Sequence, residues 1–157
     1  MKHTPRFLKY ILNIYPPFLG SGIRVDHISS DWKEVRVSLR LRWYNRNISG
    51  THFGGSLYSM TDPHFALMLM HLLGDNYIVW DKRAEIDYLR PGTGTVSATF
   101  QITDDQLQTI KEQTDLHRRY LPEFTAIIVG EDGSEVARIR KTLYVRIKKR
   151  AASSNPE

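Results

Sequence analysis

The chain has 157 residues, of which 41% are hydrophobic and 25% are charged, with a formal net charge of +5 and no cysteine. This composition is typical of a globular protein with its own apolar core, and it excludes a chain that is disordered throughout. Without cysteine, disulfides, thiol catalysis and cysteine-ligated metals are excluded. The length predicts one domain over residues 1–150, with a small and polar disordered tail over 151–157.

Two elements are predicted near the N-terminus. Residues 4–15 form a short helix that Pro16 and Pro17 end. Its apolar side consists of Phe7, Leu8, Ile11 and Leu12. From residue 33 to 44 apolar and polar residues alternate, which predicts a half-buried strand. Its apolar face consists of Val35, Val37, Leu39, Leu41 and Trp43.

No apolar stretch near the start is long enough for a signal peptide, and none in the chain is long enough for a transmembrane helix. We therefore expect a cytoplasmic protein without a membrane span.

The middle of the chain carries its longest apolar run. A polar turn over residues 45–50 leads to the stretch 51–55, and the run then extends from Ser56 to about Leu73. Apolar residues cover nearly all faces of this run, which predicts one helix buried at the centre of the molecule. Gly74 ends it.

The second half of the chain predicts strands and one surface helix. The strands are expected over residues 84–88, 96–102, 124–129 and 136–148, and the helix over 104–116, with Asp104 or Asp105 as its N-cap. A hairpin turn is expected over 131–134. A long apolar helix followed by antiparallel strands predicts an α+β fold, with an antiparallel sheet wrapped around that helix.

Much of the excess positive charge lies near the C-terminus, in a group of residues with no acid among them. These residues are Arg138, Arg140, Lys141, Arg146, Lys148, Lys149 and Arg150. A basic surface favours an anionic partner, such as a phosphate-bearing cofactor, a nucleic acid or an acidic membrane surface. The alternative is the solvated face of a strand.

Four stretches of the chain carry a resemblance by their joint order and spacing. They are Asn47, the segment His52–Asp62, the strand and turn Ala84–Gly92, and the hairpin Glu131–Ala137. Over residues 5–148 the chain resembles the hotdog-fold thioesterases of the phenylacetate-pathway type, and most closely the branch called domain of unknown function 4442. It departs from their pattern in having Phe53 between His52 and the glycines, and Pro63 directly after Asp62.

The resemblance implies a hotdog fold and a homodimer or dimer of dimers with sites between protomers. It implies thioesters of coenzyme A or acyl-carrier protein as substrates. No cofactor is expected. Asp62 falls where these enzymes keep their catalytic acid. Gly54 and Gly55 match their pair of glycines, and Asn47 matches their loop asparagine.

The residues themselves fit thioester hydrolysis. Backbone N–H groups at a helix start stabilise a developing oxyanion, and Gly54 and Gly55 stand where the buried helix should begin. A carboxylate acts as general base or nucleophile, and Asp62 is the only acid between residues 50 and 73. Alternatively, Asp62 is the N-cap of a helix that starts at Pro63, and the glycines form only a tight turn.

Helix geometry predicts that two chains share the site. Gly55 and Asp62 are about 10 Å apart along a helix axis, at a rise of about 1.5 Å per residue. Both cannot reach one thioester carbon from the same helix. Two antiparallel helices related by a two-fold axis would bring Gly55 of one chain near Asp62 of the other.

Five more residues are candidates for binding substrate. Lys82, Arg83 and Arg90 are expected to meet the phosphates of coenzyme A, although as surface charges they need no such role. Asn47 and His52 are expected to contact substrate or to shape the loop. No metal is expected, because His64 and His71 lie too far apart along one helix face to share an ion.

Three functions remain in view from the sequence. The first is an acyl-thioester hydrolase with Asp62 as base. The second is a non-catalytic protein that binds acyl groups or acyl-coenzyme A on the same scaffold. The third, a nucleic-acid binder, ranks last because no aromatic residues are interleaved in a ladder with the basic C-terminal charges, so no nucleic acid is expected as a partner.

Overall fold

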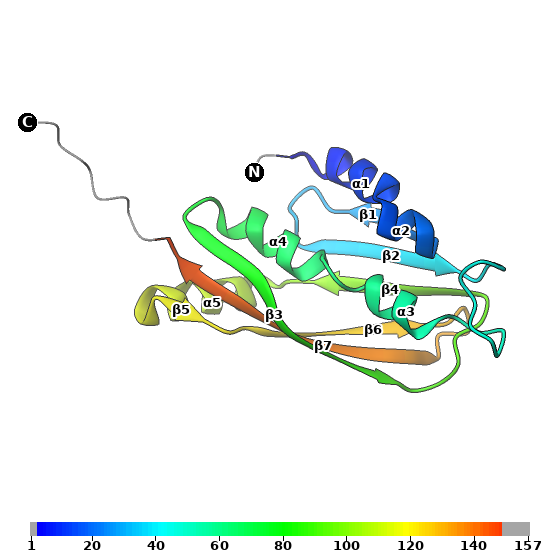
Figure 1. The fold of residues 1–157 in the computed structure, drawn as a ribbon. Coiled ribbons are helices and arrows are strands. Elements are labelled where there is room, and N and C mark those ends of the chain that lie inside the picture. The colour runs from blue at the N-terminus through cyan, green and yellow to red at the C-terminus, as the bar shows by residue number, and fades with distance from the viewer. Residues whose placement is uncertain (1–2, 149–157) are drawn as a thin grey trace, which may run out of the picture.

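In a computed structural model of the chain, residues 3–148 are described, and their strands form one antiparallel sheet (Figure 1). The strands are β1 (Ile23–Ile28), β2 (Glu34–Arg40), β3 (Tyr77–Tyr88), β4 (Thr95–Gln101), β5 (Arg119–Tyr120), β6 (Glu123–Val129) and β7 (Glu135–Ile147). Their order across the sheet is β1-β2-β4-β6-β7-β3, and the short β5 pairs with β7. The sheet curves around a central helical segment, as the sequence predicts.

Five helices accompany the sheet in residues 3–148. They are α1 (Pro5–Ile14), α2 (Pro16–Ser21), α3 (Gly54–Ser59), α4 (His64–Leu73) and α5 (Asp104–His117). α1 and α2 lie beside β1, and α5 lies at the far end of the sheet (Figure 1). The N-cap of α5 is Thr103, which forms a capping box with Gln106, so the prediction of Asp104 or Asp105 as the cap is wrong.

The prediction of one continuous central helix is corrected by the structure, which divides it into α3 and α4. Proline has no backbone N–H and its ring clashes with the preceding helical turn, so Pro63 interrupts the hydrogen-bond ladder. The residues before it close tighter turns, with Thr61 N donating to Tyr58 O at 3.0 Å and Asp62 N to Ser59 O at 3.2 Å. The break therefore lies at residues 60–63.

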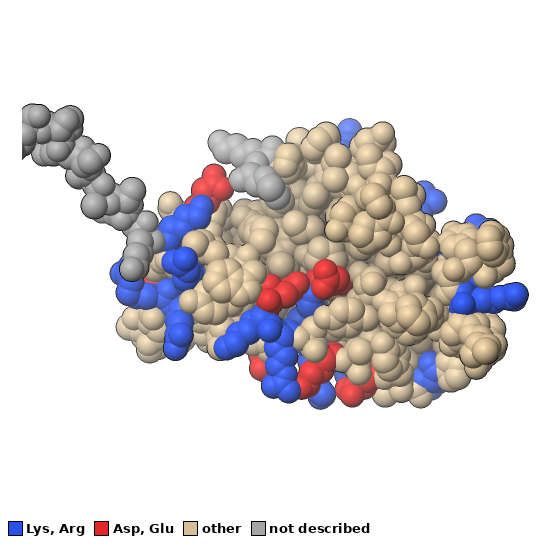
Figure 2. Space-filling model, in the orientation of Figure 1, with Lys and Arg blue, Asp and Glu red and all other residues tan. Residues whose placement is uncertain are grey.

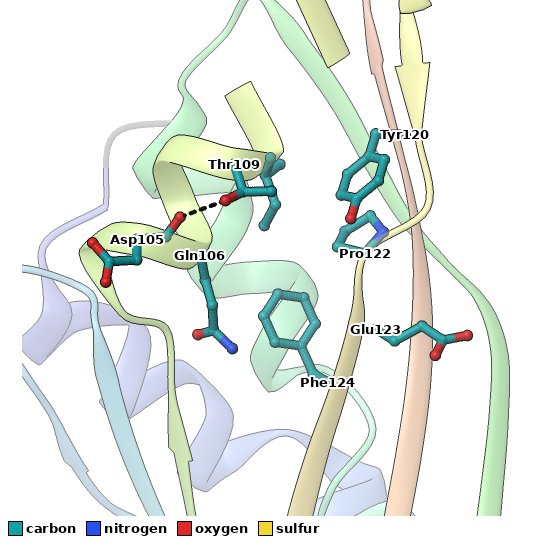
Figure 3. A pocket seen from close by; sticks show the side chains of 8 residues that line it. Asp105, Gln106, Thr109, Tyr120, Pro122, Glu123 and Phe124 are labelled. Atoms are coloured by element: carbon teal, nitrogen blue, oxygen red, sulfur yellow. Dashed lines mark hydrogen bonds between the residues drawn. The ribbon is translucent and has the colours of Figure 1, made fainter. Parts of the chain in front are cut away.

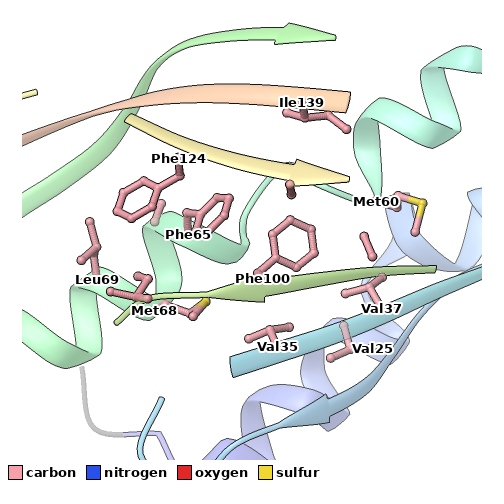
Figure 4. Close-up of a cluster of buried hydrophobic side chains, with 14 of the residues drawn as sticks. Val25, Val35, Val37, Met60, Phe65, Met68, Leu69, Phe100, Phe124 and Ile139 are labelled. Atoms are coloured by element: carbon pink, nitrogen blue, oxygen red, sulfur yellow. The ribbon is translucent and has the colours of Figure 1, made fainter. Parts of the chain in front are cut away.

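α4 supplies the centre of the apolar core (Figure 4). Phe65 stacks on Phe124 of β6 with ring centroids 4.6 Å apart, and it meets Phe100 of β4 edge-on at 5.2 Å. Met68 and Leu69 are buried beside them. Full burial of such side chains contributes about 1.5–3 kcal/mol each, so α4 is held mainly by its contacts with the sheet.

The N-terminal third differs from prediction in two places. β1 and α2 are additional elements, and β2 ends at Arg40 instead of residue 44. Val35, Val37 and Leu39 are buried as predicted, whereas Trp43 is 81% exposed because the chain leaves the sheet after β2. Asn45 causes this exit: its side-chain oxygen accepts from Arg42 N at 2.6 Å, and its amide donates to Arg40 O at 2.9 Å.

The basic residues of β7 do meet acids, which corrects the sequence interpretation. Arg138 pairs with Glu135 at 2.6 Å, and Arg140 pairs with Glu85 of β3 at 3.1 Å. Lys141 is buried and pairs with Asp81. Lys149, Arg150 and the predicted tail over 151–157 lie outside the described residues. Three described members of the C-terminal basic group, Arg138, Arg140 and Lys141, are thus paired with acids of β7 and β3.

Candidate functional site

The N-terminal end of α3 borders a pocket that collects four of the predicted site residues. The pocket has a volume of 530 Å³, and its lining includes Asn47, His52, Gly54 and Arg90. Two segments that are distant in sequence meet there: the loop that leads into the start of α3, and the end of β3 with the turn after it. We call this region the glycine end.

Close packing explains the two glycines at the start of α3. A Cβ atom on Gly54 would lie 3.2 Å from the ring of Tyr88, whose hydroxyl donates to Gly54 O at 3.0 Å. A Cβ on Gly55 would collide with the ring of Phe53. The amides of Ser56 and Leu57 already point to Phe53 O. The amides of Gly54 and Gly55 precede them and have no acceptor within the helix.

His52 is a buried support of the glycine end. Its side chain is 3% exposed, and its Nε2 lies 3.1 Å from Gly94 O. A carbonyl can only accept, so Nε2 carries the proton and Nδ1 is the unprotonated nitrogen. Within residues 3–148, Nδ1 is enclosed without a hydrogen-bond partner. Burial lowers the pKa of His52, which keeps the ring neutral.

The side chain of Asn47 forms its hydrogen bonds within its own loop. Its amide nitrogen donates to Thr51 Oγ1 at 2.9 Å and to His52 O at 3.3 Å. Its oxygen accepts from Ser49 N at 3.0 Å and from Thr51 N at 3.1 Å. These bonds fit the turn-residue alternative, in which Asn47 shapes the loop that carries His52.

Asp62 lies beyond the opposite end of α3, beside a buried lysine. The side chain of Asp62 is 55% exposed, and its Oδ1 lies 3.5 Å from Nζ of Lys141 in β7. Nζ also donates to the backbone carbonyl of Asp62, and it pairs with Asp81 Oδ2 at 2.9 Å. Lys141 itself is only 1% exposed. We call these three residues the acid end.

The helix-cap alternative for Asp62 does not match the geometry. α4 begins at His64, its N-cap is Pro63, and no side chain caps it by a hydrogen bond. Asp62 is therefore an exposed carboxylate in the break, whose backbone carbonyl is fixed by Lys141.

Two residues in or near the acid end, Asp81 and Tyr58, have raised pKa values. Burial, and less strongly the Asp62 carboxylate, raise the pKa of Asp81, while the ammonium of Lys141 opposes this rise. Burial together with the carboxylates of Asp62 and Asp81 raises the pKa of Tyr58. Tyr58 belongs to α3, and its hydroxyl stays protonated at neutral pH.

Lys141 is a site residue that sequence reasoning missed, although a signal was present. Ile139, Lys141, Leu143 and Val145 share one face of β7, and all four are buried. A lysine at an inward position of an apolar alternation needs a partner, because burying an unpaired charge is costly. The sequence therefore indicated that carboxylates of neighbouring segments lie beside Lys141.

The three basic residues predicted to bind substrate do not lie together in this chain. Arg90 lines the pocket at the glycine end. Lys82 and Arg83 lie near the middle of β3, where the strand bulges between Asp81 and Arg83. The guanidinium of Arg83 is already bound by Glu85. Because a strand advances about 3.3 Å per residue, Arg83 lies on the order of 20 Å along the chain from Arg90.

The histidines of α4 are structural, and no metal site is found in residues 3–148. Nε2 of His64 donates to Met60 O at 3.0 Å, and burial lowers the pKa of His64 to about 3. His71 donates from Nδ1 to Leu67 O at 2.8 Å and stacks on Trp32 at 3.5 Å. Over the same residues, no helix combines the length and apolar content needed to span a bilayer.

A second pocket, of 230 Å³, lies between α5 and β6 and contains none of the predicted site residues (Figure 3). Phe124 and Ile110 form its apolar part, and Asp105 and Glu123 stand at its sides. Its polar groups are partly engaged, since Thr109 Oγ1 donates to Asp105 O at 2.9 Å. The glycine and acid ends hold the predicted glycines and Asp62, so they remain the candidate site.

Comparison with protein families gives one match over most of the chain. The model of the domain of unknown function DUF4442 matches residues 4–145. Among curated proteins, none matches the sequence.

Solved structures share the fold over nearly their whole length. A protein of unknown function from Pseudomonas aeruginosa, described as a probable thioesterase, has a TM-score of 0.81 at 16% identity, covering 94% of this chain and 99% of that one. A protein of unknown function from Chlorobaculum tepidum has a TM-score of 0.72 at 13% identity, covering 92% and 98%. A thioesterase from Haemophilus influenzae has a TM-score of 0.68 at 15% identity, covering 97% of both chains. The fold is the hotdog fold, as the sequence predicts.

Proposed function

Since the chain belongs to the DUF4442 family and has the hotdog fold, we propose that it hydrolyses acyl thioesters of coenzyme A or acyl-carrier protein at a site shared by two protomers. One observation carries this proposal. The groups that the reaction needs are present, but they stand at opposite ends of α3: free amides at Gly54 and Gly55, and the carboxylate at Asp62. The H. influenzae thioesterase of the same fold supports the reaction class.

The open edge of β3 supports a two-fold dimer. β3 is the last strand of the sheet and pairs only with β7 within the described residues, so its other edge presents unpaired backbone groups. It runs past both ends of α3: Tyr88 contacts Gly54, and Asp81 contacts Lys141. Antiparallel pairing of two β3 edges about an axis near Glu85 would bring the glycine end of one protomer to the acid end of the other.

The proposed reaction divides its tasks between the two protomers. Asp62 of one protomer takes a proton from water, which attacks the thioester carbonyl carbon. Negative charge gathers on the carbonyl oxygen, where the Gly54 and Gly55 amides of the other protomer donate hydrogen bonds. The intermediate collapses with cleavage of the carbon–sulfur bond. The products are a carboxylic acid and a thiol, which receives the proton from Asp62.

Lys141 positions the general base in this proposal. Its ammonium binds the backbone carbonyl of Asp62, which fixes the segment that carries the carboxylate. Asp81 neutralises most of its charge through the 2.9 Å contact, whereas Asp62 Oδ1 lies further away at 3.5 Å. Asp62 therefore keeps a lone pair for water while its backbone stays in place.

The glycine-end pocket is proposed to receive the carrier arm. Its 530 Å³ falls within the range of small-molecule sites, about 300–1,000 Å³. Arg90 at its border would meet the coenzyme A phosphates, and Lys82 and Arg83 would meet them from the partner across the dimer. Asn47 and His52 would hold the loop that forms the pocket wall.

The test is thiol release from a panel of acyl-coenzyme A substrates by the wild type and by Asp62→Asn. General-base catalysis contributes about 10²–10⁴-fold, so turnover should fall by that factor in the variant. The matched control is Asp105→Asn, which removes an exposed carboxylate on α5 and should leave turnover unchanged.

The outcome separates hydrolysis from binding. If Asp62→Asn and Asp105→Asn hydrolyse the panel as fast as the wild type, Asp62 is not the base. If the wild type binds acyl-coenzyme A tightly but releases no thiol from any substrate, coenzyme A hydrolysis is excluded. The non-catalytic acyl-binding alternative would then describe the protein better.

A further inference from the structure

α1 presents an apolar stripe to solvent. Its members are Phe7, Tyr10, Ile11 and Ile14, which are between 39% and 62% exposed. Their spacing of three, four and seven residues places them along one side of the helix. Leu8 and Leu12 are the buried residues of α1, so the predicted apolar side is divided: Phe7 and Ile11 face outward.

Two polar side chains of α1, Lys9 and Asn13, contact β1. Asn13 donates to Val25 O at 3.0 Å and accepts from Val25 N at 2.8 Å. Lys9 Nζ donates to Asp26 O at 2.6 Å. α1 thus buries two leucines and closes the outer edge of β1 with polar groups, while four further apolar side chains stay exposed.

A second apolar group adjoins this stripe. Trp43, Tyr44 and Ile48 are exposed in the loop after β2, Trp43 and Ile48 almost completely. The loop is tied to the end of α2, where Asn45 donates to Ser21 O at 3.0 Å. Tyr15 and Leu19, also exposed, lie on α2 or beside it. We call the exposed residues of α1, α2 and this loop the α1–loop surface.

The α1–loop surface is basic as well as apolar. Residues 4–25 and 40–60 contain no Asp or Glu, and the exposed arginines of α1 and the loop are Arg6, Arg42 and Arg46. The nearest carboxylate along the chain, Asp26, pairs with Arg24 at 3.6 Å. In Figure 2 the acidic side chains gather in the lower middle and at the left, and the upper right, over α1, α2 and the loop, shows none.

We propose that the α1–loop surface docks the protein on an anionic lipid bilayer, at headgroup depth. Tyrosine and tryptophan are enriched at the membrane–water interface, and arginines near the surface attract anionic lipids. A short helix with its apolar side outward lies in this interface without crossing it. A second copy of the chain fits less well, because a two-fold contact would bring like charges together.

Co-sedimentation of the full chain with lipid vesicles tests the proposal. Vesicles of phosphatidylcholine and phosphatidylglycerol in equal parts should bind the protein, and vesicles of phosphatidylcholine alone should bind it much less. Binding should weaken with salt, since the screening length falls from about 10 Å at 0.1 M to about 3 Å at 1 M.

Two double variants probe the two components of the surface. Arg42→Gln with Arg46→Gln should weaken binding about thirty-fold, from roughly five-fold per cation at an anionic surface. Tyr10→Ser with Ile14→Ser should weaken binding to both kinds of vesicle. The matched controls are Arg118→Gln with Arg119→Gln, and Leu116→Ser with Leu121→Ser, which remove exposed groups near α5 and should bind like the wild type.

Three results would overturn the proposal: no binding of the wild type to anionic vesicles, equal binding to both vesicles, or equal losses in the controls. The mass in solution then identifies the other occupant. A lower oligomer mass in Tyr10→Ser with Ile14→Ser would assign the stripe to a second copy of the chain. The proposal itself expects that mass to stay unchanged.

Discussion

The two ends of α3 differ in how they use polar groups. At the glycine end, the side chain of Asn47 bonds within its own loop, and Gly54, whose amide has no acceptor within α3, borders a pocket. At the acid end, a lysine from the far end of the chain holds two carboxylates, one of them exposed. The glycine end offers backbone amide donors, and the acid end offers an exposed carboxylate, so the two ends supply different groups that the proposed reaction needs.

The largest predicted effect comes from mixing two inactive chains. Asp62→Asn destroys the acid end, and Gly54→Ala disturbs the glycine end by pressing a methyl group against Tyr88. Each variant alone should be inactive. Refolded together, half of the dimers contain one chain of each kind and one intact site of two, so activity should return to about a quarter of wild type.

The matched control for this mixture is Asp62→Asn refolded with Asp62→Asn,Gly54→Ala, in which no intact site can form. Thiol release is the readout, and equal dimer content is checked by sedimentation. If both groups act within one chain, no mixed dimer contains an intact site, and the two mixtures would be equally inactive.

The next prediction concerns the buried neighbour of the acid end. Burial lowers the pKa of His64 to about 3 from an ordinary value of 6.5, so only the unfolded chain takes up this proton between those values. The contribution of neutral His64 to the free energy of unfolding is fully present above pH 6.5 and is lost as the pH drops toward 3. Its loss should reach about 2–3 kcal/mol between pH 7 and about pH 4.5.

Urea unfolding at the two pH values measures this loss. His64→Leu should remove most of it, whereas His27→Gln, at a histidine outside the core, should keep the wild-type difference. The same pH difference in His64→Leu and in the wild type would show that other groups account for the acid sensitivity.

A smaller effect is expected from the lysine that joins the acid end. Lys141→Met leaves Asp81 and the Asp62 carbonyl without their cation. Loss of one partner in a fully buried pair costs about 3–5 kcal/mol, but these carboxylates reach water, so we expect about 2 kcal/mol. Thermal or urea unfolding measures the change.

Arg140→Met is the matched control. Arg140 lies in the same strand as Lys141 and also makes ion pairs, but it is exposed. It should cost less than about 1 kcal/mol. Equal losses in the two variants would mean that burial does not distinguish Lys141. Turnover adds a second readout, since Lys141→Met should lower kcat through the misplaced Asp62, and Arg140→Met should not.

The smallest predicted effect concerns which end of α3 binds the phosphates of acyl-coenzyme A. Arg90→Gln should raise KM for acyl-coenzyme A about ten-fold with little change in kcat, the loss expected for one charge-assisted hydrogen bond. Arg83→Gln should raise it less, because Glu85 already binds that guanidinium. Thioesters of N-acetylcysteamine carry no phosphate, so both variants should process them like the wild type. A larger effect of Arg83→Gln would place the phosphates at the acid end.

Regular alternation made much of the sheet predictable. β2, β4, β6 and β7 bury the residues that alternation selects, because one face of each packs on the core. In β1 a bulge after Val25 shifts the buried position to Ile28, so the pattern that identifies a strand is broken. The break in the central helix was signalled by Pro63, but the apolar run around it favoured one helix.

The residues of the candidate site were predictable from the sequence, but the long-range contacts that join them were less so. The segment His52–Asp62 indicates the amides and the acid, because their chemistry depends on local residue types. The bond from Lys141 to Asp62 joins positions 79 residues apart, and no local pattern contains it. The bond from Asn45 to Ser21 O was missed for the same reason, since the two residues are 24 positions apart.

The length of α3 has a further consequence. A helix of six residues is far below the length that is stable by itself, so α3 persists only while its two ends are held. Its amides should therefore exchange with deuterium through local opening, much faster than those of α4, which the core encloses. Occupation of both sites of the proposed dimer would hold the two ends of each α3. Protection of α3 against exchange would then report binding even for a ligand that is never turned over.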